Sequence, residues 1–92
     1  MDGKIYVNQS LIITLNMMDD MPGVTDQHIS YQNPKGVKGT FSAKVEGQNL
    51  VSTVLTGVLN IPGIWKLQGW AKGPGWEMPG RTVLMTVHKL FT

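Results

Sequence analysis

Cysteine is absent from this 92-residue sequence, which excludes a disulfide scaffold, a thiol nucleophile and a thiolate metal site. Charge is also scarce, because Asp, Glu, Lys and Arg make up 15% of the residues, against about 25% in an average soluble domain. The net charge of +2 is too small to indicate, by itself, a protein that binds nucleic acid or a membrane surface. We expect a chain with so little charge to cover part of its surface against a partner.

Long hydrophobic runs are missing as well. No segment approaches the roughly 18 apolar residues of a membrane span, and residues 1–4 lead into no apolar stretch of the signal-peptide kind. We therefore expect a soluble chain that is not secreted by a signal peptide. Its length and its 41% of hydrophobic residues suit one compact core, so a single domain over residues 1–92 is predicted.

Helix formers are rare, since Ala and Glu together number four, whereas Val, Ile and Thr number 23. β-Branched side chains favour strands, and 16 glycines and prolines cut the chain into short pieces. Each piece carries apolar residues at alternate positions, which indicates a strand with one buried face. The prediction is an all-β antiparallel sandwich of about seven strands, at residues 4–7, 11–17, 27–32, 39–46, 50–55, 64–72 and 81–90.

The predicted core centres on a corner of the chain. Gly63 opens a strand in which Trp65 and Leu67 share one face, an arrangement that anchors a sandwich corner. On the preceding strands, alternation places Tyr31 and Phe41 on inward faces. These five residues are the expected structural core.

Catalytic and metal-binding patterns are not found. His28 and His88 are the only imidazole bases, and neither lies beside a nucleophile motif. Asp19, Asp20 and Asp26 do not combine with them at metal-ligand spacing. We expect no enzyme activity, no cofactor and no metal.

Tryptophan outside the core is the feature that most favours an interaction surface. Trp70 is predicted to point outward together with Lys66, Gln68 and Lys72, and Trp76 lies in a Gly/Pro-rich turn. Exposing a large aromatic side chain forgoes about 2–3 kcal/mol of burial, so these five residues are the candidate interface. The alternative is that the hairpin folds Trp76 over Trp70 as a cross-strand pair.

Charge is distributed unevenly along the chain. Residues 1–30 carry one base and four acids, a net of −3, and residues 31–92 carry seven bases and two acids, a net of +5. Opposite charges favour head-to-tail contacts between copies, and hence a homo-oligomer, although a scattered solvated surface would show the same pattern. Residues 5–18 and 47–65 hold no charge, which makes them second candidates for covered surface.

Three segments together resemble a known family. Residues 29–36 read ISYQNPKG, residues 39–45 read GTFSAKV, and residues 62–68 read PGIWKLQ. This combination is similar to the immunoglobulin-like N-terminal domain of phage baseplate upper proteins, over about residues 5–90. The sequence departs from the family at Lys35, where Asp or a similar turn residue is usual, and in lacking the fibre or receptor-binding segments that usually follow.

The resemblance implies an immunoglobulin-like sandwich that acts as a phage or prophage structural module. Its implied partners are other tail or baseplate proteins, contacted without nucleic acid or membrane, and its implied location is the virion tail after assembly in the bacterial cytoplasm.

Two other functions are compatible with the sequence. A carbohydrate-binding module would stack sugar rings on the tryptophans, with hydrogen bonds from Asn49, Asn60 or Gln68. A single-stranded nucleic-acid binder would stack bases on Trp70 and Trp76.

Overall fold

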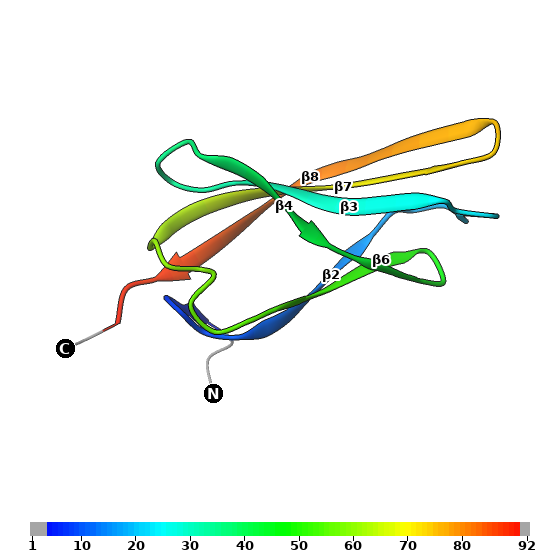
Figure 1. The fold of residues 1–92 in the computed structure, drawn as a ribbon. Coiled ribbons are helices and arrows are strands. Elements are labelled where there is room, and N and C mark those ends of the chain that lie inside the picture. The colour runs from blue at the N-terminus through cyan, green and yellow to red at the C-terminus, as the bar shows by residue number, and fades with distance from the viewer. Residues whose placement is uncertain (1–3, 91–92) are drawn as a thin grey trace.

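The protein is an all-β sandwich, as predicted. A computed structural model describes residues 4–90 (Figure 1), and these contain eight strands and no helix. The strands are β1 (Ile5–Tyr6), β2 (Leu11–Asn16), β3 (Asp26–Gln32), β4 (Lys38–Ser42), β5 (Lys44–Glu46), β6 (Asn49–Val54), β7 (Gly63–Gly73) and β8 (Trp76–His88).

Two sheets form the layers of the sandwich. One sheet has five strands in the order β1-β8-β7-β3-β4, and the other has three in the order β2-β6-β5. This grouping of the second, sixth and fifth strands against the third, seventh and eighth follows the immunoglobulin layout. Among the described strands, the parallel pairing of β1 with β8, at Ile5↔Val87 and Tyr6↔His88, departs from the antiparallel pattern.

A change of sheet explains why there are eight strands rather than seven. Residues 39–46 alternate without interruption, yet β4 pairs with β3 while β5 pairs with β6 in the other layer. Ala43 lies between them, and its carbonyl accepts a 2.9 Å hydrogen bond from the side-chain amide of Gln27. The chain therefore crosses from one layer to the other while its inward side chains, Phe41 and Val45, stay on the core side.

The core fills the space between the two layers. Trp65 is 2% exposed, and its indole N–H donates a 2.9 Å hydrogen bond to the carbonyl of Ile61. Leu67 and Phe41 are also buried. Tyr31 is half-buried, and its ring stacks on Phe41 with centroids 4.6 Å apart and tilts against Trp65 at 5.5 Å.

Gly63 lies where the corner before β7 meets the β3–β4 hairpin. Its φ of +131° is a conformation that favours glycine, and a Cβ atom there would lie 2.8 Å from Cγ of Pro34. The hairpin is closed by Asn33, whose carbonyl accepts from the Gly36 N–H at 2.9 Å. Two of the three segments that carry the family resemblance therefore touch at this point.

Residues 1–3 and 91–92 lie outside the described residues. The ends of the predicted domain and the opening segment used for the signal-peptide prediction fall there. Within residues 4–90, the structure contains no helix long and apolar enough to cross a membrane.

Candidate interaction surface

The outer face of the five-stranded sheet carries most of the predicted interface residues. Along β7, buried Trp65, Leu67 and Ala71 alternate with exposed Lys66 and Lys72. Gln68 is exposed on the same outer face, and its amide nitrogen donates a 2.9 Å hydrogen bond to the Gly80 carbonyl. Trp70 is half-buried on that face. Four of the five predicted residues, Lys66, Gln68, Trp70 and Lys72, therefore share one surface.

Trp70 is held in place by its neighbours. It lies directly opposite His28 of β3, and the two rings stack with centroids 4.9 Å apart and an interplanar angle of 27°. Its indole N–H donates a 3.1 Å hydrogen bond to Oε1 of Glu77 on β8. The ring is thus fixed by contacts on both flanking strands, so docking against it would cost little side-chain entropy.

Trp76 does not lie on this surface, although the sequence-based prediction groups it with Trp70. The β7–β8 hairpin closes over Pro74 and Gly75, which puts Trp76 directly opposite Gly73. Opposite residues share a face of the sheet, and this is the face that also carries buried Ala71. Trp76 packs against the core, and its indole N–H donates a 2.9 Å hydrogen bond to the Pro22 carbonyl. The same register excludes the expected Trp70–Trp76 pair, because Trp70 lies opposite Pro79.

Two exposed aliphatic residues extend the surface toward the other end of β7. Ile64 is 55% exposed and Leu84 is 62% exposed. Leu84 lies opposite Lys66, and Ile64 lies opposite Thr86, so both stand on the outer face. With Pro34 of the β3–β4 hairpin they line a shallow depression. The pairing of β7 with β8 makes Ile64 and Leu84 diagonal neighbours on this face.

Charges on the outer face are mixed rather than uniformly basic. Lys72 lies between Asp26 of β3 and Glu77 of β8, each directly opposite it. Lys66 lies between Gln32 and Leu84 and has no acidic residue opposite it. The positive charge of Lys66, beside the aliphatic residues, is therefore not balanced by an acidic residue on either neighbouring strand.

The described residues that could bind a metal ion, act as catalytic bases or bind a sugar do not cluster at one site. In residues 4–90, no three His, Asp or Glu side chains come close enough to hold a metal ion. His28 stacks on Trp70, whereas the ring of His88 lies against Tyr6 at 5.9 Å. The polar residues expected to assist sugar binding are also dispersed, since Asn49 belongs to β6 in the other sheet and Asn60 to the loop before β7.

Comparison with known proteins found no matching family model, no matching curated protein and no matching solved structure. The fold and its surface define a small β-sandwich whose outer sheet face carries a tryptophan, exposed aliphatic residues and charges of both signs.

Proposed function

We propose that the protein is a non-enzymatic structural module of a phage or prophage tail, of the baseplate type, which works by binding another tail protein. The outer face of the five-stranded sheet, around Trp70, Lys66 and Leu84, is the proposed docking surface. Its location would be the virion tail.

The observation that carries the proposal is the exposure of Ile64 and Leu84 on the same outer sheet face as a rigid, half-buried Trp70. Burying an aliphatic side chain of this size contributes about 1.5–3 kcal/mol, so leaving two of them in water on one face is unfavourable for an isolated domain. A tryptophan fixed by neighbours and rimmed by polar side chains is the usual anchor of a protein interface.

The tail assignment is supported by the family resemblance. The Pro34 hairpin and the Gly63 corner, which carry much of that resemblance, contact each other beside Ile64 at one end of the proposed surface. The resemblance also supports a role in assembly, since the resembled domain joins larger parts to a tail.

The proposal predicts that Trp70→Ala and Leu84→Asp each weaken binding to a tail partner by at least about 30-fold, the loss expected when an interface anchor is removed. The measurement is a pull-down of tail and baseplate proteins encoded beside this gene, followed by titration calorimetry with the one retained. Thr53→Asp, which puts a charge on the other sheet, is the matched control and should bind as the wild type does.

Two results would count against this function. One is full binding by both variants, which would move the interface elsewhere. The other is a wild-type protein that retains no tail protein but whose tryptophan fluorescence is quenched saturably by a glycan, which would favour carbohydrate binding.

A further inference from the structure

The two uncharged stretches of the sequence are neighbours in space. β2 belongs to residues 5–18 and β6 to residues 47–65, and the two strands pair over six residues, from Leu11↔Val54 to Asn16↔Asn49. Uncharged residues therefore form a continuous two-stranded ribbon at one side of the three-stranded sheet. Its outward residue Ile12 is 66% exposed.

The second edge of β2 has no partner strand in the described residues. β2 is the terminal strand of its sheet, with β6 on one side. Met17 N–H donates to the Gln48 carbonyl on the β6 side at 2.8 Å, and in an antiparallel pair this direction alternates along the strand. The backbone groups of Leu11, Ile13 and Leu15 therefore face β6, whereas those of Ile12, Thr14 and Asn16 face away from the sheet.

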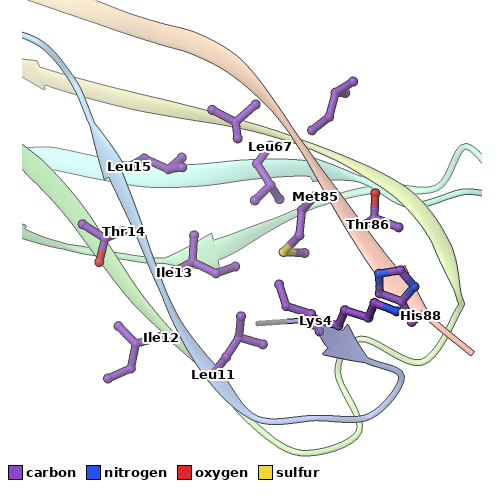
Figure 2. Close-up of a pocket in the computed structure, with 13 residues that line it drawn as sticks. Lys4, Leu11, Ile12, Ile13, Thr14, Leu15, Leu67, Met85, Thr86 and His88 are labelled. Atoms are coloured by element: carbon purple, nitrogen blue, oxygen red, sulfur yellow. The ribbon is translucent and has the colours of Figure 1, made fainter. Parts of the chain in front are cut away.

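An apolar groove runs beside this free edge (Figure 2). Ile13 and Leu15 of β2 face Leu67 and Met85 of the five-stranded sheet across it. Val83 also lines the groove and is 38% exposed, although it lies opposite buried Leu67 and so stands on the inner face of its sheet. The sandwich is thus open along this side.

The ionisable residues around the opening are all basic. Lys4 and His88 lie at the end of the groove next to Leu11. Arg81 lines the adjoining depression beside Asn16 and Met18. No Asp or Glu lines either hollow within residues 4–90.

We propose that a second copy of this chain binds here, by antiparallel pairing of β2 with β2 around a two-fold axis at Thr14. In this register Thr14 lies opposite Thr14 of the copy, and Ile12 lies opposite Asn16. Every outward-facing backbone N–H and C=O of Ile12, Thr14 and Asn16 then meets a partner. The two three-stranded sheets join into one sheet of six strands, with both cores on the same side.

Two features favour a copy of this chain over a different strand. The free edge is self-complementary, because the same three positions serve as both halves of the pair. β2 carries no charge, so the two-fold axis brings no like charges together. This two-fold contact differs from the head-to-tail contact that the charge distribution suggested.

The proposal is tested by placing a charge at residue 14, on the two-fold axis. Thr14 is exposed, so Thr14→Lys and Thr14→Glu leave the core unchanged. We expect the wild type to form a dimer at roughly 10–200 µM, the range of a small interface, when measured by sedimentation velocity. Each charged variant alone should dissociate at least about tenfold more readily, since like charges meet at the axis. An equimolar mixture of the two variants should regain the dimer, and Thr14→Val, which keeps the backbone N–H, should dimerise as the wild type does.

Several outcomes would overturn the proposal. A wild-type monomer throughout this range would do so, and would leave the edge to a strand from another protein. Dimers of unchanged strength in both charged variants would place the contact elsewhere, and failure of the mixture to recover would exclude an axis at Thr14. Circular dichroism of each variant verifies that it folds. Trp70 lines neither hollow, so Trp70→Ala should still dimerise, and failure of this inference is distinguishable from failure of the docking function.

Discussion

Replacing Trp65 by alanine is expected to lower the free energy of unfolding by about 3–5 kcal/mol, the range for removing a large aromatic side chain from a packed core. Trp65 is 2% exposed, so its whole ring would leave a cavity between the sheets. The Ile61 carbonyl would also lose its indole donor. A small domain is stable by about 5–15 kcal/mol, so this one substitution removes a large fraction of the total.

Urea denaturation followed by circular dichroism measures the loss. Trp65→Phe is the matched variant, because it keeps most of the apolar contact with Tyr31 and removes the hydrogen bond to Ile61. Its expected cost is smaller, about 1–3 kcal/mol, the range for losing one buried hydrogen bond and part of a ring. A loss below about 1 kcal/mol for the alanine variant would show that Trp65 is not a core residue.

The sequence was sufficient to predict the class of fold, because each strand shows its buried face by alternation. Ile29 on β3 lies between His28 and Ser30, and Trp65 and Leu67 on β7 lie either side of Lys66; these three apolar side chains are nearly fully buried. Alternation has a period of two residues and is not interrupted when a strand bends from one sheet to another. Alternation therefore predicts a single strand at residues 39–46, across the crossing at Ala43.

For a similar reason, alternation predicts only part of the candidate surface correctly. The outward position of Trp70 follows from alternation within β7, but the position of Trp76 depends on the register of the β7–β8 hairpin. A turn of two residues, Pro74 and Gly75, aligns Trp76 with Gly73 and so turns it inward. Gly73 provides the room, since a Cβ atom there would lie 2.5 Å from the Trp76 ring. The sequence shows the glycines of this turn, but it does not show that Gly73 lies opposite Trp76.

The two proposed contacts use different sides of the sandwich. Docking would involve the outer face of the five-stranded sheet, whereas self-association would involve the β2 edge of the three-stranded sheet. A two-fold pair formed through β2 would leave both outer faces open to partners. Such a pair would hold two docking surfaces, and bivalent attachment strengthens binding without any new contact.

Gly63→Ala is the second substitution with a large expected effect, about 2–6 kcal/mol of lost stability. The φ of +131° at Gly63 is unfavourable for any residue with a Cβ atom, which costs about 1–3 kcal/mol. The added Cβ would also lie 2.8 and 2.9 Å from Cγ and Cβ of Pro34. A proline ring has little freedom to move aside, so the hairpin at Pro34 or the corner before Trp65 must shift, at a further cost of about 1–3 kcal/mol.

Gly57→Ala separates these two causes. Gly57 also has a positive φ, +89°, but a Cβ atom there would meet nothing within 4 Å. The control should therefore lose only the backbone part, about 1–2 kcal/mol. Thermal unfolding of the two variants side by side measures the difference, which reports the contact between Pro34 and Gly63. Equal losses would mean that the hairpin and the corner are not packed together, and would remove the structural link between two of the segments on which the proposed baseplate assignment rests.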